Sequence, residues 1–208
     1  MIINPHEYAE GFISEDSVKM AARARGIEIG THDVSPGTGA YLRHLAQLLS
    51  AQSVVEIGTG SGVGSLWLLE GMIKSGTLTS IDDEMEHSSI AKVAFAEAEI
   101  AAPRFRLITN SVMDVMTKLA DRAYDLVVFR HNPEDLSFAI SEAHSILRSG
   151  GVLVIDNFFG GGRVPDPAQR DPKTIALREA GKAIKADTDS WMSVLITTGD
   201  GLLLATKL

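Results

Sequence analysis

Four glycines at alternate positions, directly after a short apolar run, constrain this chain more than any other feature. The segment reads Ser53-Val-Val-Glu-Ile-Gly-Thr-Gly-Ser-Gly-Val-Gly64. In open α/β sheets, a buried strand that enters a glycine-rich turn and then a helix brings bare backbone close to a ligand. The helix that follows would direct its N-terminal amides at the bound group. The segment therefore predicts a ligand site at the end of a strand over residues 53–57.

Glu56 is the charged residue within that apolar run. An acid near the end of a buried strand is costly unless it has a partner. We expect that partner to be a cationic or hydroxyl-bearing ligand, or nearby backbone amides.

The composition limits the possible classes of function. The chain has 208 residues, 45% hydrophobic and 22% charged, enough for one sizeable α/β domain. The net charge of −8 argues against a general nucleic-acid binder, which needs a basic face. No apolar run is long enough for a membrane span, no signal segment is evident, and the absence of cysteine fits a reducing cytoplasm. We therefore expect a cytoplasmic protein that acts on a small molecule.

Strands and helices alternate after residue 50. The predicted strands are 53–57, 77–81, 105–109, 124–129 and 152–155, and the predicted helices are 61–73, 85–100, 112–120, 133–147 and 172–185. At the end, segments 191–198 and 202–207 flank Gly199-Asp-Gly201, whose turn chemistry predicts an antiparallel hairpin. Five such units closed by a hairpin predict an α/β fold with one doubly wound, mostly parallel sheet.

Residues 1–50 are predicted to form a helical extension of the same domain, ahead of the ligand-binding part at 51–208. Ser14-Glu-Asp16 predicts the start of a helix over 18–29, and Pro36 suits the first turn of a helix over 37–49. Residues 1–15 are polar and mixed, which predicts a flexible arm or an oligomer contact.

Asp82 follows the second predicted strand, 24 residues after Gly58. An acid in that place accepts hydrogen bonds from ribose hydroxyls, so the ligand is expected to contain adenosine. The G-x-G-x-x-G pattern of nicotinamide dehydrogenases does not fit, because its third glycine position falls on Val63 or Ser65. The acid before the glycines and the terminal hairpin are instead typical of S-adenosylmethionine enzymes.

Glu56-Ile-Gly-Thr-Gly-Ser-Gly62 resembles motif I of class I S-adenosylmethionine-dependent methyltransferases. From about residue 10 to 208, the chain resembles more narrowly the catechol/caffeoyl-CoA O-methyltransferase family. The supporting segments are Val34-Ser-Pro36, Leu78-Thr-Ser-Ile-Asp82, Tyr124-Asp-Leu-Val-Val-Phe129, Leu147-Arg-Ser-Gly-Gly-Val-Leu-Val-Ile-Asp-Asn157, Gly162-Arg-Val164 and Gly199-Asp-Gly-Leu202. The resemblance implies a Rossmann-like seven-stranded sheet of order 3-2-1-4-5-7-6 with the last strand antiparallel, and a homodimer.

The same resemblance implies S-adenosylmethionine as cofactor and a small hydroxylated, aromatic acceptor. By position, Glu56, Gly58 and Gly60 would line the methionine and ribose end, and Asp82 would bind the ribose hydroxyls. The other implied cofactor residues are Ser111 and Val112 beside the adenine, Thr59 in the turn, and Val34 and Ser65 in the pocket wall.

The segment after the fourth strand departs from that family's pattern. The family reads Phe-Ile-Asp-Ala-Asp-Lys, whose first Asp ligates a divalent metal and whose Lys is often credited as general base. This chain reads Phe129-Arg-His-Asn-Pro-Glu134, so His131 replaces the metal-binding Asp and Glu134 replaces the Lys. The other two ligand positions, Asp156 and Asn157, are kept.

These replacements leave three interpretations open. In the first, a divalent metal binds to Asp156, Asn157 and His131. Imidazole suits Mn²⁺, Fe²⁺, Co²⁺ or Zn²⁺ better than Mg²⁺, so one of these four ions is expected. In the second, no metal binds, and His131 acts as general base for the acceptor hydroxyl. In the third, the acceptor site is degenerate, and the chain is a non-catalytic S-adenosylmethionine-binding protein.

Other conspicuous polar residues are predicted to be structural or solvated. These are Asp125, Asp83, Glu84 and five histidines without ligand spacing, His6, His32, His44, His87 and His144. The loop 160–172 follows Phe158-Phe159. Beside Asn157, this region is either a mobile wall of the acceptor pocket or a plain surface loop.

Overall fold

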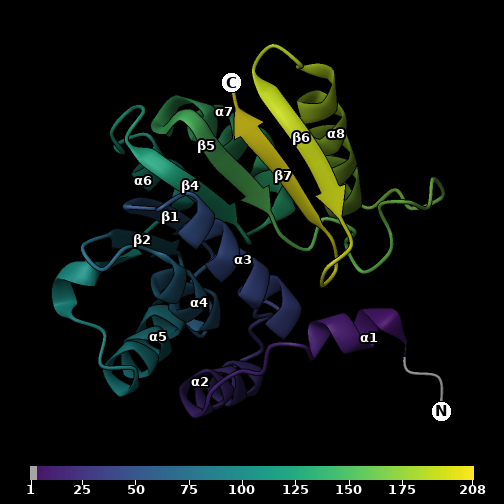
Figure 1. Ribbon diagram of the computed structural model, residues 1–208. Coiled ribbons are helices and arrows are strands. Elements are labelled where there is room, and N and C mark those ends of the chain that lie inside the picture. Colours follow the sequence, from purple (N-terminus) through teal and green to yellow (C-terminus); the bar gives the residue numbers. More distant parts are fainter. Residues whose placement is uncertain (1–3) are drawn as a thin grey trace.

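A seven-stranded sheet runs through the computed structural model, which describes residues 4–208 (Figure 1). Its strand order is β3-β2-β1-β4-β5-β7-β6, and β7 runs antiparallel to both of its neighbours. The strands are β1 (Ser53–Ile57), β2 (Thr77–Asp82), β3 (Phe105–Thr109), β4 (Tyr124–Phe129), β5 (Leu147–Ile155), β6 (Trp191–Ile196) and β7 (Leu202–Lys207). The predicted α/β fold, strand order and terminal hairpin are confirmed.

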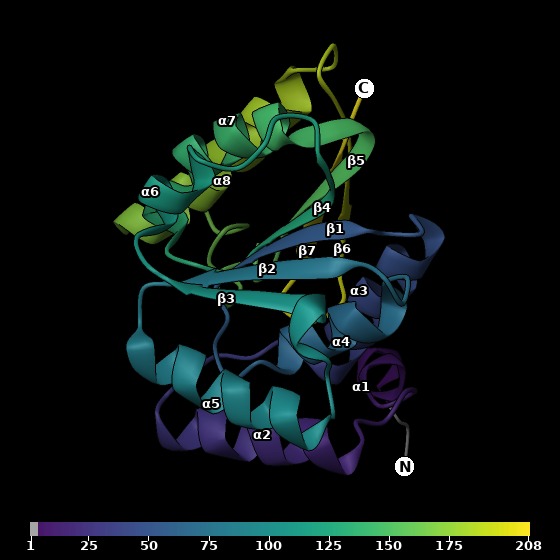
Figure 2. The same cartoon turned by 90° about the vertical axis from the view of Figure 1, so that its left-hand side faces the viewer.

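Helices cover both faces of the sheet (Figure 2). One layer holds α3 (Pro36–Leu48), α4 (Val63–Gly71) and α5 (Met85–Glu97), and the other holds α6 (Val112–Met116), α7 (Leu136–Ile146) and α8 (Pro172–Ala186). Helix α2 (Ser17–Glu28) packs against α5, and α1 (Pro5–Glu10) against α3. No helix within residues 4–208 is both long and apolar enough to cross a membrane.

Strand β1 shows why the core has two halves. Successive side chains of a strand point to opposite faces of its sheet. Val54 accordingly joins the buried cluster beneath α3, α4 and α5, whereas Val55 and Ile57 join the cluster beneath α6, α7 and α8.

Several boundaries differ from the prediction. The strand expected over 152–155 begins earlier, at Leu147, which pairs with Tyr124, and the register shifts before Leu126 pairs with Val152. The helix expected over 112–120 ends at Met116. The helix expected over 133–147 is divided into a 3₁₀ turn, η2 (Pro133–Asp135), and α7.

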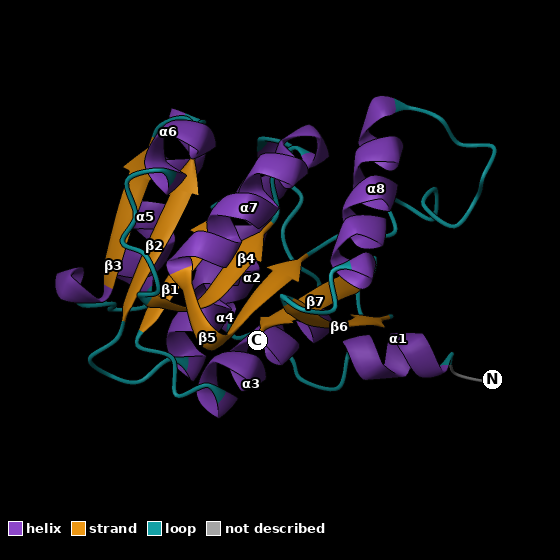
Figure 3. Cartoon of the chain, turned by 90° about the horizontal axis from the view of Figure 1, so that it is seen from above, coloured by secondary structure: helices purple, strands orange, loops and turns teal. Residues whose placement is uncertain are grey.

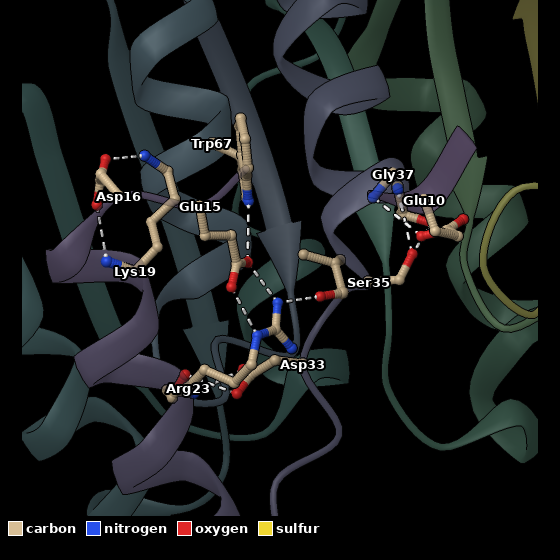
Figure 4. A network of polar contacts seen from close by, with 12 residues as sticks. Glu10, Glu15, Asp16, Lys19, Arg23, Asp33, Ser35, Gly37 and Trp67 are labelled. Atoms are coloured by element: carbon tan, nitrogen blue, oxygen red, sulfur yellow. Dashed lines mark hydrogen bonds and ion pairs between the residues drawn. The ribbon is translucent and has the colours of Figure 1, made fainter. Parts of the chain in front are cut away.

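The N-terminal segment forms a helix that the sequence did not predict. In α1, the Asn4 side chain accepts a hydrogen bond from the His6 amide and Pro5 occupies the first turn. The Glu10 carboxylate accepts hydrogen bonds from Gly37 N at 2.9 Å and from Gly199 N at 2.7 Å (Figure 4 shows Glu10 beside Gly37). The described part of the predicted flexible arm is therefore anchored, and residues 1–3 lie outside the described residues.

A partly buried ion pair between Arg23 and Glu15 holds the loop between α2 and α3. Arg23 donates to both carboxylate oxygens of Glu15 and to the carbonyl of Val34 (Figure 4). Asp33 accepts hydrogen bonds from Ser61 N at 3.1 Å and Ser61 Oγ at 2.7 Å. These contacts place the loop next to the glycine-rich turn.

Candidate active site

A cleft of about 900 Å³ lies at the carboxyl ends of β1, β2, β4 and β5. Its volume falls within the range of small-molecule sites, and ligands of open α/β sheets bind at this edge. Six of the residues predicted from the sequence line the cleft, namely Gly58, Gly60, Asp82, His131, Asp156 and Asn157. The fold therefore brings these six predicted cofactor and acceptor residues into one space.

The turn after β1 exposes backbone to the cleft. Gly58 has φ of +92°, a conformation that strongly favours glycine, and a Cβ there would collide with the carbonyl oxygen of Arg130. The Gly58 amide donates to Ile81 O at 2.8 Å, which fixes the turn to β2. The local sequence is thus needed for this geometry.

Asp82 lies beside that turn and is 3% exposed. Its Oδ2 accepts a hydrogen bond from Gly60 N at 3.1 Å, and its Oδ1 from Glu84 N at 3.0 Å. His87 Nδ1 lies 3.0 Å from Oδ1. A carboxylate has about four acceptor sites, so about one remains for a ligand hydroxyl. His87 lines the cleft too, although its sequence spacing gave no sign of it.

Glu56, Thr59 and Ser65 lie fully buried behind the turn. Glu56 Oε2 accepts hydrogen bonds from the hydroxyls of Ser65 and Ser80, so serine hydroxyls take the place of the backbone amides considered as partners. Burial raises the pKa of Glu56, and the Arg130 charge and these hydroxyls oppose that rise. Within residues 4–208, Glu56 Oε1 accepts no hydrogen bond.

Three further predicted cofactor residues lie outside the lining of the cleft. Val34 is buried in the core beneath α3 to α5, and Val112 in the core beneath α6 to α8. Ser111 is exposed as the N-cap residue of α6. A cofactor role for these three residues stays a prediction.

The end of the cleft that follows β5 carries Asp156 and Asn157. Asp156 is 6% exposed, and its Oδ1 accepts a hydrogen bond from Asn157 N at 2.8 Å. Burial raises the pKa of Asp156, and the charge of Arg130 opposes that rise. Phe129, Ile155 and Leu177 give this end an apolar wall. Polar and apolar groups therefore lie side by side there, which suits a hydroxylated ring.

His131 lies close to two acids. Its Nε2 lies 3.7 Å from Asp83 Oδ2 and 3.7 Å from Asp135 Oδ2. Among residues 4–208, no three His, Cys, Asp or Glu side chains gather where they could hold a metal ion. Asparagine is not one of those residue types, so a metal site at Asp156, Asn157 and His131 stays a prediction.

The loop after β5 is attached to the terminal hairpin. Phe158 is buried, and Phe159 N donates to Asp200 O at 2.8 Å. Gly161 N donates to Asp200 Oδ2 at 2.6 Å, and Gly160 and Gly161 line the cleft. The tucked phenylalanine pair thus supports a wall of the cleft, and Figure 3 shows the rest of this loop reaching beyond α8.

Two acidic residues, Asp125 and Glu134, do not line the cleft. Asp125 accepts hydrogen bonds from Gln52 N, Ser53 N and Arg148 Nε, which fixes the starts of β1 and β5. The side chain of Glu134 is exposed on η2. Asp125 therefore has the structural role predicted from its position.

Comparisons with known proteins agree with this geometry. A family model described as O-methyltransferase matches residues 7–208. A relative from Mycobacteroides abscessus, named as an O-methyltransferase, is 46% identical over 200 residues, covering 96% of this chain and 93% of the relative.

Two solved structures are also similar. A protein from Corynebacterium glutamicum has a TM-score of 0.88 at 31% identity, covering 96% of this chain and 94% of its own. The O-methyltransferase TomG from Streptomyces achromogenes, involved in tomaymycin synthesis and solved in complex with S-adenosylmethionine, has a TM-score of 0.86 at 26% identity and covers 99% of both chains. The chain described here belongs to the O-methyltransferase family.

Proposed function

We propose that this O-methyltransferase takes its methyl group from S-adenosylmethionine and transfers it to a hydroxyl of a small aromatic acceptor. The observation that carries the proposal is one cleft with Gly58, Gly60 and Asp82 at one end, Asp156 at the other, and His131 beside Asp83. The first end has the bare backbone and the acid that an adenosine ligand requires.

The residues present fit this cofactor. Asp82 retains an acceptor site for a ribose hydroxyl, and the buried Glu56 Oε1 has no hydrogen-bond partner within residues 4–208. When bound, S-adenosylmethionine supplies an electrophilic methyl group on a sulfonium. The protein's contribution is then to orient the acceptor and to remove its proton.

His131 is the proposed general base. A neutral imidazole has a suitable proton affinity for a phenolic hydroxyl, and the carboxylates of Asp83 and Asp135 would stabilise the imidazolium that forms. The Asp156 carboxylate would accept a hydrogen bond from a second acceptor hydroxyl. Phe129, Ile155 and Leu177 would contact the ring.

Methyl transfer to a panel of catechols and other phenols tests the proposal. Calorimetric titration with S-adenosylhomocysteine and, separately, with NAD tests the cofactor. We expect binding of S-adenosylhomocysteine alone, and a 10²- to 10⁴-fold lower kcat in His131→Gln, on the order of a general-base contribution. Tight NAD binding would overturn the proposal, and binding without turnover on any acceptor would support the non-catalytic alternative.

We also propose that the protein is a homodimer. The edge strand β6 exposes Met192, Val194 and Leu195 by 64%, 54% and 45% of their surfaces. An exposed apolar edge strand invites association unless it is covered. Light scattering should give twice the chain mass, and Val194→Glu should give a monomer. The cytoplasmic location stays a prediction.

A further inference from the structure

Arg130 places a buried guanidinium directly behind the glycine-rich turn. It follows β4, and its side chain is 3% exposed although it borders the cleft. Its Nη2 donates to Gly58 O at 2.6 Å and lies 3.5 Å from Glu56 Oε1. No sequence motif marks Arg130, because its partners are about 70 residues away along the chain.

The hydrogen-bonding capacity of this group is largely unused. Within residues 4–208, Nε and Nη1 of Arg130 have no hydrogen-bond acceptor. In the same described part of the chain, Oε1 of Glu56 has no hydrogen-bond donor. Buried charged groups left in that state cost free energy, so a partner is expected. The unused groups comprise donors on a cation and an acceptor on an anion. Together they are complementary to a zwitterion, in which a carboxylate and an ammonium share one carbon.

Gly64 provides the space for this arrangement. It lies in the first turn of α4 with an ordinary backbone conformation, so its backbone does not require glycine. A Cβ there would lie 2.5 Å from Glu56 Oε1 and 3.3 Å from Arg130 Cζ. Gly62, the N-cap residue, makes no side-chain capping bond, so the N-terminus of α4 adds partial positive charge at the same place.

We propose that Arg130 is the receptor for the α-carboxylate at the methionine end of the cofactor. This rests on the proposed use of S-adenosylmethionine. Asp82 holds the ribose at one side of the glycine-rich turn, and Arg130 lies at the other side, behind Gly58. The carboxylate accepts from Nη1, one of the two unused donors, and Glu56 Oε1 accepts from the neighbouring ammonium.

The experiment removes the carboxylate from the ligand and the guanidinium from the protein in turn. Calorimetry compares S-adenosylhomocysteine with its decarboxylated analogue, S-adenosyl-3-thiopropylamine, on the wild type, Arg130→Gln and Arg163→Gln. Arg163 also lines the cleft, and its Nε donates to Gly160 O, so it controls for the general effect of cleft charge.

We expect the wild type and Arg163→Gln to bind the analogue on the order of 10- to 100-fold more weakly than S-adenosylhomocysteine. Arg130→Gln should bind the two ligands within about threefold of each other. Equal loss for both ligands in Arg130→Gln, with the discrimination kept, would show a merely structural role and overturn the proposal.

If Arg130→Gln does not fold, the affinities of the wild type for the two ligands still test the proposal. Equal affinity of the wild type for the two ligands overturns the Arg130 assignment and leaves the cofactor proposal standing. No binding of S-adenosylhomocysteine to the wild type overturns both.

Discussion

His87 Nδ1 lies 3.0 Å from Oδ1 of Asp82, and both side chains border the cleft beside the glycine-rich turn. The same carboxylate accepts hydrogen bonds from the amides of Gly60 and Glu84. A group whose orientation is fixed in this way loses little freedom when a ligand binds. His87 is therefore a positioning residue for Asp82.

Removing this imidazole should weaken cofactor binding moderately. We expect His87→Ala to raise the Kd for S-adenosylhomocysteine by about threefold to tenfold, because Asp82 loses one of the hydrogen bonds that orient its carboxylate. Calorimetry measures the change. His44→Ala, an exposed position on α3 outside the cleft, is the matched control. An unchanged Kd in His87→Ala would contradict the positioning role.

Asp82→Asn should have the larger effect. The substitution replaces one carboxylate oxygen by an amide donor, so the Gly60 amide and a ribose hydroxyl compete for fewer acceptor sites. We expect affinity to fall on the order of 10- to 100-fold. Glu86→Gln, whose side chain is exposed outside the lining of the cleft, should bind normally in the same titration. If both variants bind as the wild type does, Asp82 does not contact the ligand.

Metal removal should leave turnover unchanged. His131 Nε2 lies 3.7 Å from the carboxylates of Asp83 and Asp135, and no three His, Cys, Asp or Glu side chains among residues 4–208 gather where they could hold a metal ion. We expect the initial rate with an accepted phenol to be the same before and after dialysis against a chelator, and with millimolar Mn²⁺ or Mg²⁺ added. Loss of turnover on chelation, restored by Mn²⁺, would instead favour a metal held by Asp156, Asn157 and His131.

Asp125 should stabilise the fold in a pH-dependent way. Burial raises its pKa, but Ser53 N, Arg148 and Gln52 N outweigh that effect and hold the pKa below its ordinary value. A lowered folded-state pKa gives stability above the unfolded pKa of about 3.9, which is lost as pH falls through the folded pKa. Asp125→Asn should cost about 1–3 kcal/mol at pH 7.

Urea unfolding at several pH values measures this contribution. The difference between wild type and Asp125→Asn should narrow below pH of about 3.9. The exposed Asp121→Asn should stay within about 0.5 kcal/mol of the wild type throughout. A constant difference across the pH range would show that the Asp125 charge is not the source of stability.

The sheet was predictable because its signals are local. Apolar runs, glycine turns and the Gly199-Asp-Gly201 turn each indicate one element, and their alternation, with the family resemblance, gives the strand order. The start of β5 was not predictable from the sequence. Its bulge depends on pairing with Tyr124, and Gly150 and Gly151 locally resemble a turn.

The residues of the site were predictable where a motif marks them. Gly58, Gly60 and Asp82 follow strand ends at typical spacing, and they line the cleft. Arg130 and His87 were missed, since an arginine and a histidine without motif spacing are most often surface residues. Their burial and contacts come from the packing of β1 against β4 and from the start of α5.

Glu10 links the two ends of the described chain to the cleft. Its carboxylate accepts from Gly199 N and Thr198 Oγ1, and the next residue of that hairpin, Asp200, accepts from Gly161 N in the cleft wall. We therefore expect the docking of α1 and the occupancy of the cleft to be coupled, and such coupling is reciprocal. Filling the cleft should slow amide hydrogen exchange in α1, and loosening α1 should weaken the ligand by the same factor.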